Sequence, residues 1–500
     1  MDIYPNSRAS LQQFISVGLP STLLATLLAY KVVLLGIGLW ASRRSSSGAE
    51  FYLAGRGLGP WVASISAAAS SSSAWTLLGV SGAAYTWGLS AVWLFPACLS
   101  GFVLNGWLVA GPLRRLARET GAVTLLGVLV HGLERKWARG VLKAGGAIIL
   151  FSLLVYVASQ FKAAGVTFAE TFEMGATWAI VVGGGIVLLY TMSGGFWAVS
   201  ITDLLQGLVM AAASVLVPVC ALVEVGGLGG LLQGLRDYQV SMGGGDSAVF
   251  LDATRGFSGP ALFGFIVGTL GIGLGYPGQP HVVNRFMAMR SDPEVRKGAW
   301  ISVAWACVIY SGMLFAGWCG RVLIDDMGNN EAVLLALTKL IFSPAVAGVI
   351  IAAVLSAIMS TADSQLLVCS STVSQDWARG LGGMKSLGVG IDRLTVLLIG
   401  LLAIAAAVLI DQTIFDSVLF AWSVLGAAFG PLLLVRLWKG PVCGRCALVS
   451  ICVGAGVSLA WALTPELKAV VYELVPAFAV ALAIAWRGHS VWAIETKGNP

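Results

Sequence analysis

Charged side chains are scarce in this sequence of 500 residues. Asp, Glu, Lys and Arg make up 11% of it, whereas hydrophobic residues make up 57% and the mean hydropathy is +0.87. Soluble domains usually contain about 25% charged residues. A soluble fold of this length could not bury so much apolar surface, because exposed surface decreases too slowly as a protein grows. The composition predicts a polytopic protein of the lipid bilayer, and it excludes a nucleic-acid-binding protein, a disordered protein and a disulfide-rich scaffold.

The sequence also lacks the motifs of several other functional classes. It contains no G-x-x-x-x-G-K-[ST] phosphate-binding loop, which argues for a carrier or channel over an ATP-driven pump. Its three histidines, His131, His281 and His489, fall in segments predicted to be cytoplasmic, so no nucleophile–base pair is expected inside the membrane. Cys443 and Cys446 have no second cysteine pair to complete a zinc site. These absences predict a protein that is not an enzyme.

Long apolar runs occur along almost the whole chain. A membrane-spanning helix needs about 20 apolar residues, and the first run is too long for a secretion signal. A short apolar segment at 331–341 resembles a half-helix that leads into the ninth span, and 226–259 is predicted to be a Gly-rich external loop. The thirteen predicted spans cover residues 19–41, 60–85, 89–113, 142–165, 175–194, 199–225, 260–281, 298–322, 344–372, 393–410, 413–436, 443–463 and 469–486.

The basic residues indicate the orientation of these spans. With the N-terminus outside, most Lys and Arg fall in cytoplasmic segments, including Arg43 and Arg44 after the first span and Arg285 after the seventh. Acidic residues such as Glu170 and Glu173 fall outside. This asymmetry is typical of membrane proteins. It predicts a multi-pass protein of the plasma or inner membrane, with an external N-terminus and a cytoplasmic C-terminus.

Apart from acids at the ends of spans, two acidic residues lie within predicted spans, where an ionisable group costs about 2.5–3.5 kcal/mol on insertion scales. They are Asp203 in span 6 and Asp363 in span 9. Lys31 and Lys162 lie near span ends and can extend to the interface. Asp203 is close to the end of its span, so a structural capping role is the alternative there. Asp363 is the stronger indication of function.

The surroundings of Asp363 suit a hard cation. Ser360, Asp363 and Ser364 have the spacing i, i+3 and i+4, which places them on one helical face, with Thr361 beside them. Side-chain oxygens are the ligands that hard cations prefer. The alternative is that the hydroxyls bond back to their own helix, but that alternative leaves the buried acid unexplained.

Two spans contain candidate interruptions. The small and hydroxylated residues of span 2 either allow close helix contact or mark a broken helix, whereas span 7 cannot remain a regular helix. Span 2 contains the run A-A-A-S-S-S-S-A-W at 67–75, and span 7 contains four glycines and two prolines at 271–280. Unwound backbone within a membrane is tolerated only where it lines a cavity or is buried in protein. The two segments are five spans apart, which is typical of a transporter built from inverted repeats. The single transporter domain, 1–500, would then comprise an extra span at 19–41, repeats at 60–225 and 260–436, and two further spans at 443–486.

At these positions the chain resembles the sodium/solute symporter family, and most closely its sodium/proline branch, over about 51–486. The motifs that carry the resemblance are A-G-R-G-L-G-P at 54–60, A-S-S-S-S-A-W at 69–75, G-G-F-W-A-V-S-I-T-D at 194–203, G-L-G-Y-P-G-Q-P-H at 273–281, R-F-M-A at 285–288 and M-S-T-A-D-S-Q-L-L-V-C-S-S at 359–371. Each motif alone is weak, and their order and topology together are specific.

The resemblance implies thirteen spans, inverted repeats of spans 2–6 and 7–11, and sodium-coupled uptake by alternating access. It also implies the following residues by position. The main sodium site maps to Ala69, Ser72, Ala357, Ser360 and Thr361. A second sodium position, described in some members, maps to Asp203, Ser360, Asp363 and Ser364. The substrate side maps to Ser73, Ala74, Ile272, Tyr276, Gln279 and Pro280.

Two of these positions depart from the proline branch. Ser71 stands where that branch has an aspartate important for sodium, and Ile272 stands where it has a tryptophan. We hypothesise that Asp363 restores the missing carboxylate from the facing helix. The favoured function is sodium-coupled symport of L-proline or a related amino acid. The alternatives are a sodium or proton symporter for another small solute, such as a monocarboxylate, and a transporter-like substrate sensor. The sequence does not determine the sodium stoichiometry or the oligomeric state.

Overall fold

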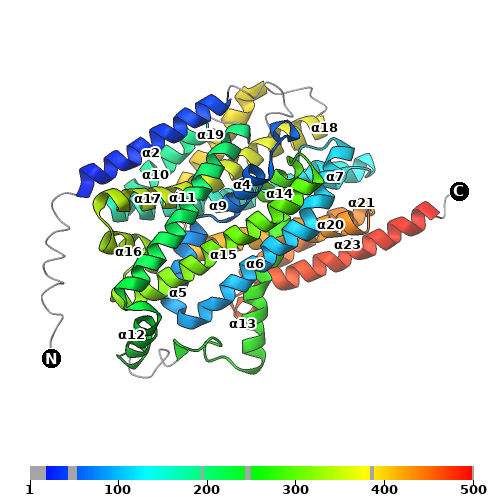
Figure 1. Cartoon of the computed structure of the whole chain (residues 1–500). Helices are drawn as coiled ribbons and strands as arrows, with labels where there is room; N and C mark the ends of the chain where they lie inside the picture. The colour runs from blue at the N-terminus through cyan, green and yellow to red at the C-terminus, as the bar shows by residue number, and fades with distance from the viewer. Residues whose placement is uncertain (1–18, 43–52, 193–195, 242–248, 383–387, 498–500) are drawn as a thin grey trace, which may run out of the picture.

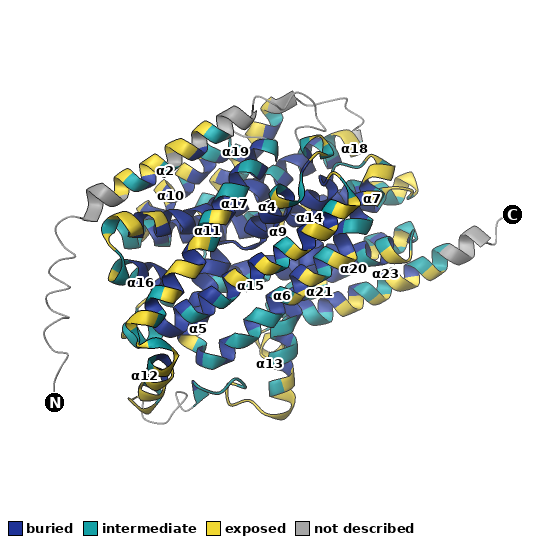
Figure 2. Ribbon diagram, in the orientation of Figure 1, coloured by how far each residue is buried: buried dark blue, intermediate teal, exposed yellow. Residues whose placement is uncertain are grey.

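The described residues form one all-helical bundle. The computed structural model describes residues 19–42, 53–192, 196–241, 249–382 and 388–497. Figure 1 shows the long helices packed side by side, and Figure 2 shows buried residues at the centre and exposed residues on the outside. Arg43 and Arg44, predicted to end the first span, lie outside the described residues, as does the side chain of Lys31. The predicted all-α fold is confirmed.

The helices of ten or more residues are, in chain order, α2 (Leu19–Ser42), α4 (Pro60–Ser71), α6 (Leu94–Leu104), α7 (Ala110–Thr120), α9 (Arg135–Phe172), α10 (Ala176–Thr191), α11 (Phe196–Glu224), α12 (Gly227–Ser241), α13 (Gly259–Gly271), α15 (Asp292–Leu323), α17 (Pro344–Ser371), α19 (Gly388–Leu409), α20 (Ile414–Trp438), α21 (Gly444–Ala462) and α23 (Leu474–Lys497). Shorter segments connect them, among them η2 (Trp75–Gly79), α5 (Val80–Trp87), η3 (Gly88–Trp93), η4 (Asn105–Val109), η6 (Ile272–Gly278), α14 (Pro280–Met287), η7 (Asn330–Ala332), α16 (Val333–Ile341) and η8 (Thr372–Arg379).

The outer surface of the bundle is suited to lipid. Ten helical stretches of the described chain are long and apolar enough to cross a membrane, and two shorter apolar helices accompany them. Large apolar side chains on their outer faces, such as Trp178, Leu189 and Phe263, are 70–71% exposed. Exposed apolar surface on this scale is stable only against another apolar phase. The protein is therefore a multi-pass membrane protein, and the count of thirteen spans stays a prediction.

Span 2 is interrupted, as its serine run predicts. α4 ends at Ser71, and Ser72 leaves the helical region with φ −101° and ψ 73°. The hydroxyl of Ser71 donates to the carbonyl of Ala68 at 2.9 Å, so it competes for an acceptor of the helix backbone. The chain resumes as the π-helical segment η2 and continues into α5. The last carbonyls of α4 are therefore left pointing into the middle of the protein.

Span 7 is interrupted by η6, a 3-10 helical segment between α13 and α14. Pro277 has no N–H to donate, and Gln279 is extended with φ −92° and ψ 102°. Side chains from neighbouring helices satisfy the freed carbonyls. Trp422 Nε1 donates to Ile272 O at 3.0 Å, and Asn105 Nδ2 donates to Tyr276 O at 3.3 Å. This explains how unwound backbone is tolerated at that depth.

The segment 226–259 is not the irregular loop predicted from its glycines. It contains the helix α12, in which Leu231 and Leu235 are buried one turn apart against the bundle. Arg321 of α15 lies 4.1 Å from the ring centroids of both Tyr85 and Tyr238, so a cation–π contact fastens α12 to the long helices. The glycine content concealed this amphipathic pattern. The half-helix predicted at 331–341 is present as α16.

One end of the bundle is closed by hydrogen bonds between distant segments. Leu58 N donates to Ala288 O, and Arg290 N donates to Leu58 O, both at 3.1 Å. These two bonds form a parallel bridge between Leu58 and Met289, the link between the start of α4 and the end of α14. Arg114 of α7 donates to the carbonyls of Met289 and Arg290 at 3.0 and 2.7 Å. The charge asymmetry of the sequence predicts that this end is cytoplasmic.

A glutamate ties helices together at the opposite end. Glu331 of η7 accepts from the N–H groups of Ile414 and Phe415, at 3.0 and 2.7 Å, and so caps the N-terminus of α20. Burial raises the pKa of Glu331, and the two backbone donors oppose this shift without cancelling it. The contact joins the α15–α16 connection to α20.

Candidate functional site

The broken end of α4 lies against the middle of α17. Ser360 Oγ lies 3.4 Å from Ala69 O and 3.3 Å from Ala357 O, and Thr361 Oγ1 donates to Ser70 O at 3.2 Å. All these residues are fully buried. The structure thus brings together four of the five residues predicted for the main sodium site, and it adds the carbonyl of Ser70. The fifth, Ser72, follows the end of α4, where its N–H donates to Ala68 O at 2.9 Å.

This arrangement suits a monovalent hard cation. The last carbonyls of a helix have no intrahelical donors and carry the negative end of the helix dipole. Two hydroxyl oxygens from α17 face them, so every nearby ligand atom is oxygen. No group of three or more His, Cys, Asp or Glu side chains able to hold a metal occurs in the described part of the chain. Carbonyls and hydroxyls without a carboxylate cluster favour Na⁺ over a divalent metal.

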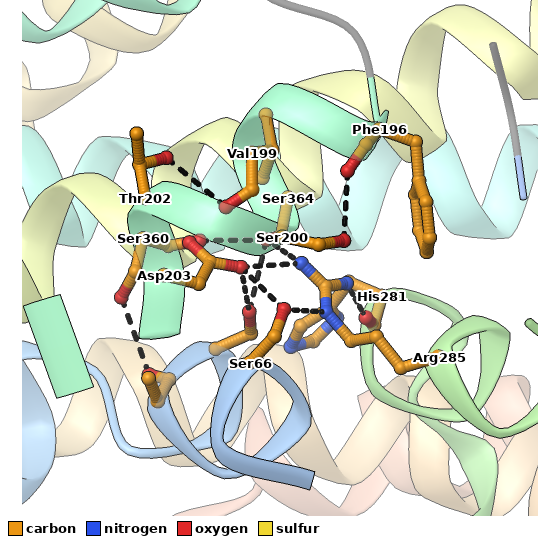
Figure 3. Close-up of polar contacts among 12 residues, drawn as sticks. Ser66, Phe196, Val199, Ser200, Thr202, Asp203, His281, Arg285, Ser360 and Ser364 are labelled. Carbon is orange, nitrogen blue, oxygen red and sulfur yellow. Dashed lines mark hydrogen bonds and ion pairs between the residues drawn. The ribbon is translucent and has the colours of Figure 1, made fainter. Parts of the chain in front are cut away.

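A second polar cluster lies about one helical turn away and is built around Asp203 (Figure 3). Asp203 Oδ2 accepts from Ser66 Oγ at 2.7 Å and from Ser70 Oγ at 3.3 Å. Ser70 Oγ also lies 2.9 Å from Ser364 Oγ. The helices α4, α11 and α17 therefore converge on one buried carboxylate. Asp203 and Ser364, both predicted for a second sodium position, do lie together.

The same cluster contains Arg285, which the charge pattern had placed in a cytoplasmic segment. Its side chain is not exposed to water: it is 1% exposed, and its Nη2 lies 2.9 Å from Asp203 Oδ2. Its Nε donates to Ser66 Oγ at 2.9 Å, and further bonds run to Ser364 Oγ and to the carbonyl of His281. The guanidinium can remain buried because an opposite charge and several acceptors surround it. Figure 3 shows it reaching from α14 into the space between α4 and α11.

Asp363, the other acid of the predicted second position, is bonded to a different helix. Its Oδ1 accepts from Thr191 Oγ1 of α10. Ser71, whose missing carboxylate Asp363 was hypothesised to replace, bonds instead to the backbone of its own helix. The two side chains therefore have different partners. Replacement of the lost carboxylate by Asp363 stays a hypothesis, and any such effect on an ion at α4 would act through charge.

The first predicted substrate residues lie at the restart of span 2. Ser73 Oγ accepts from Trp75 N at 3.1 Å and lies 3.4 Å from the hydroxyl of Tyr156. Ala74 N donates to Gln160 Oε1 at 3.1 Å. Tyr156 and Gln160 are buried side chains of α9 that the sequence analysis did not single out. An amide within an apolar helix was the available indication of Gln160.

The other predicted substrate residues surround η6. Tyr276 packs between Phe102 and Trp422, with ring centroids 5.1 and 4.7 Å away. Its hydroxyl lies 3.2 Å from that of Tyr310. Trp422 also donates to the carbonyl of Ile272, as described above. α20 therefore supplies an aromatic side chain beside Ile272, the position at which the proline branch has a tryptophan. Trp422 and Tyr310 were missed because apolar helices give no indication of which aromatic residues face the break.

The remaining residues lie where η6 passes into α14. Gln279 Nε2 donates to Gly275 O at 3.1 Å and to Trp422 O at 3.0 Å, while Pro280 occupies the first turn of α14. His281, predicted to lie in a cytoplasmic segment, is 0% exposed, and its ring lies edge-on to that of Tyr156 at 5.8 Å. The carboxamide of Gln279 is therefore held in place by backbone carbonyls on two sides.

Close packing at the second break depends on Gly101. A Cβ atom there would lie 2.0 Å from Cδ2 of Tyr276, a distance that real contacts do not reach. We expect Gly101→Ala to displace the tyrosine ring, to cost roughly 1–3 kcal/mol of folding free energy, and to raise the substrate concentration for half-maximal uptake. Gly185→Ala on α10 is the control, because its Cβ would meet nothing within 4 Å. Equal thermal stability and equal uptake in the two variants would contradict the expectation.

The cavities next to η6 differ in volume at the two ends of the bundle. A cavity of about 370 Å³ is lined by Ile272, Thr269, Phe415 and Tyr472, at the end away from the Leu58 bridge. On the other side of Tyr276 a cavity of only about 20 Å³ borders Ser71, with room for about one water molecule. Of the predicted substrate residues, Ile272 lines the larger cavity and Tyr276 lines the smaller one.

Comparison with known proteins agrees with this geometry. The model of the sodium:solute symporter family matches residues 51–454. The sodium/proline symporter of Escherichia coli K12 is 32% identical over 475 residues, which cover 92% of this chain and 91% of that protein. The high-affinity proline transporter PutP of Bacillus subtilis 168 is 34% identical over 457 residues, which cover 89% and 93%.

The fold is also found among solved structures. The structure of a Na⁺-coupled sialic acid symporter in a substrate-bound outward-open state matches with a TM-score of 0.76 at 17% identity, and the match covers 94% of this chain and 98% of that one. At this identity the likeness shows the fold alone. The extent of the family match and the identity to its members lead to one conclusion: the chain belongs to the sodium:solute symporter family.

Proposed function

We propose that this chain is a secondary active transporter that couples Na⁺ entry to the uptake of L-proline or a related amino acid. The observation that carries the proposal is the meeting of Ser360 and Thr361 hydroxyls with the free carbonyls of Ala69 and Ser70, beside a second broken helix. The names of the sodium/proline symporter and of PutP, similar along most of their length, support proline as the solute.

Sodium would act as a clamp between two repeats. We assign α4 to a first repeat at 60–225 and α17 to a second at 260–436. The oxygens of both helices are needed to replace the ion's hydration shell, so the ion stabilises the conformation in which they approach. A ligand shifts a conformational equilibrium only by its differential affinity for the two states. Sodium and solute would then raise each other's affinity by the same factor.

A zwitterionic solute fits the space between the breaks. The half-helix that begins near Ala74 points the positive end of its dipole into the break, which favours a carboxylate there. The carbonyls of η6 and the amide oxygen Oε1 of Gln279, which has no other hydrogen-bond partner in the described structure, can accept from an ammonium group. The rings of Tyr276 and Trp422 offer an apolar wall for a pyrrolidine ring. Ile272 leaves this wall less aromatic than in the proline branch, so related amino acids belong in the test.

We assign the structure to an outward-facing state in which the inner end is closed and the predicted substrate and sodium residues are buried. The large cavity lies at the end with few basic residues, and the Leu58–Met289 bridge closes the end rich in arginine. With the positive-inside rule, the open end is external, the N-terminus is outside and the C-terminus is cytoplasmic. Opening the inner end requires breaking the bridge.

Uptake into proteoliposomes tests this function. Purified full-length protein is reconstituted, and labelled proline, other amino acids and monocarboxylates are supplied with an inward sodium gradient, an inward proton gradient or no gradient. We expect proline uptake that is driven by sodium and abolished by dissipating its gradient. Uptake driven only by protons, uptake confined to monocarboxylates, or binding without transport would each reject the proposal; the last would indicate a sensor.

A further inference from the structure

The side chain of Arg285 is surrounded by acceptor oxygens from several helices, as a bound metal ion would be. Its three nitrogens contact acceptors on three other helices as well as one on α14: Ser66 of α4, Asp203 of α11, Ser364 of α17 and the carbonyl of His281. Phe196 lies under the guanidinium plane, with its ring centroid 5.4 Å from Cζ. Each of the three nitrogens of this planar group therefore has an acceptor in the protein, without water.

The atoms that hold Arg285 are those that a second sodium ion would need. Asp203 Oδ2 and Ser364 Oγ are both bound by Nη2 of the same guanidinium, so one nitrogen lies where the ion would have to bridge them. A sodium ion and this nitrogen cannot both occupy that point. Two positive charges sharing one carboxylate would also repel each other strongly in a region that excludes water.

The net charge of the buried groups in this region can be neutralised by one monovalent cation. Asp203 and Asp363 are both 0% exposed, and the charges of both act on Arg285. Two carboxylates and one guanidinium have a net charge of −1. One Na⁺ at the site between α4 and α17 brings the sum to zero, and a second would leave an uncompensated buried charge, which is costly.

We infer that Arg285 is a tethered cation that permanently holds the second cation position, so that the chain binds a single Na⁺. This inference rests on the proposed sodium coupling and specifies its stoichiometry. Because Asp203 lies on α11 of the first repeat and Arg285 on α14 of the second, the pair also makes a link between the repeats that needs no ion from solution.

Counting bound sodium ions tests the inference. The full-length protein and its variants are purified in detergent, and equilibrium binding of radioactive Na⁺ is measured as ions per protein molecule. We expect one ion for the wild-type protein and one for Arg285→Lys, which keeps the charge. We expect two for Arg285→Gln, and one for the double variant Asp203→Asn/Arg285→Gln, because the additional ion depends on Asp203. Two ions in the wild type, falling to one in the double variant, would overturn the inference, as would a single ion in Arg285→Gln.

Arg285→Gln leaves Asp203 buried without its partner, and this can prevent folding. The comparison then uses the wild type and the double variant, in which neither charge remains: equal counts of one support the tethered cation, and a loss of one ion in the double variant refutes it. The result is distinguishable from failure of the proposed function. If the wild type binds no sodium, sodium is not the coupling ion and the proposed function fails. The inference is still supported if Arg285→Gln gains a sodium ion that depends on Asp203. It is overturned if Arg285→Gln gains no ion.

Discussion

Replacing Thr361 by valine is expected to raise the sodium concentration for half-maximal uptake roughly 10- to 100-fold. Valine keeps the shape of the side chain and removes the oxygen that faces Ser70 O at 3.2 Å. An interaction of a hydroxyl with a charged group is worth about 1.5–3 kcal/mol, and every 1.4 kcal/mol corresponds to a tenfold change in affinity. Uptake in proteoliposomes as a function of external sodium, at saturating substrate, measures the shift.

Thr167→Val is the matched control for this variant. Thr167 is also a buried threonine, but its hydroxyl donates to Ala163 O of its own helix at 2.8 Å. We expect its sodium dependence to equal that of the wild-type protein. If Thr361→Val and Thr167→Val shift the sodium curve equally, the effect comes from packing, and Thr361 is not an ion ligand.

Replacing Asp363 by asparagine is expected to lower sodium affinity by about 100-fold and to abolish sodium-driven uptake at ordinary gradients. Side chains three residues apart on a helix lie about 5–6 Å from each other, so Asp363 is close to an ion at Ser360. At an effective dielectric constant of about 20, a unit charge at about 6 Å contributes roughly 3 kcal/mol. Asparagine keeps an acceptor for Thr191 Oγ1, so the contact with α10 can persist.

The measurement for Asp363→Asn is uptake driven by sodium and, separately, by protons. We expect both to be absent at gradients that drive the wild-type protein with sodium. Asp376→Asn is the control: that buried aspartate accepts from Thr124 Oγ1 at 2.6 Å, in the segment that follows α17, and should leave sodium dependence unchanged. An unaltered sodium dependence in Asp363→Asn would show that its charge does not act on the ion.

Both helix breaks could be predicted from the sequence because their causes are local. Four consecutive serines compete with the backbone of α4, and glycines with two prolines prevent a regular helix in η6. Spacing also groups the hydroxyl residues of α17 on one helical face, and the resemblance to the family predicts that they face the break in span 2. Such features depend on neighbours along the chain, so they can be read without knowledge of the fold.

The partners of Arg285 and Asp363 could not be predicted in this way. Hydropathy alone places Arg285, seven residues after the end of η6, in water. Only the fold shows that Asp203, 82 residues earlier in the chain, lies beside it. For Asp363, spacing could not predict the partner because it does not fix the direction of each side chain around the helix. Successive residues of an α-helix are about 100° apart, so Asp363 can face α10 while Ser364 faces α4, although both share a broad face with Ser360. Spacing identifies the face, and the packing of neighbouring helices decides which side chain meets which partner.

The bridge between Leu58 and Met289 sets a scale for the transport cycle. It consists of two main-chain hydrogen bonds, and each is worth about 1 kcal/mol net when water can replace it. One monovalent ion crossing a potential of 100 mV yields about 2.3 kcal/mol. An interaction of this strength favours the closed conformation but still allows it to open by thermal fluctuation. Opening the bridge alone therefore costs about as much free energy as one such ion supplies, and the bonds from Arg114 to Met289 and Arg290 add to that cost.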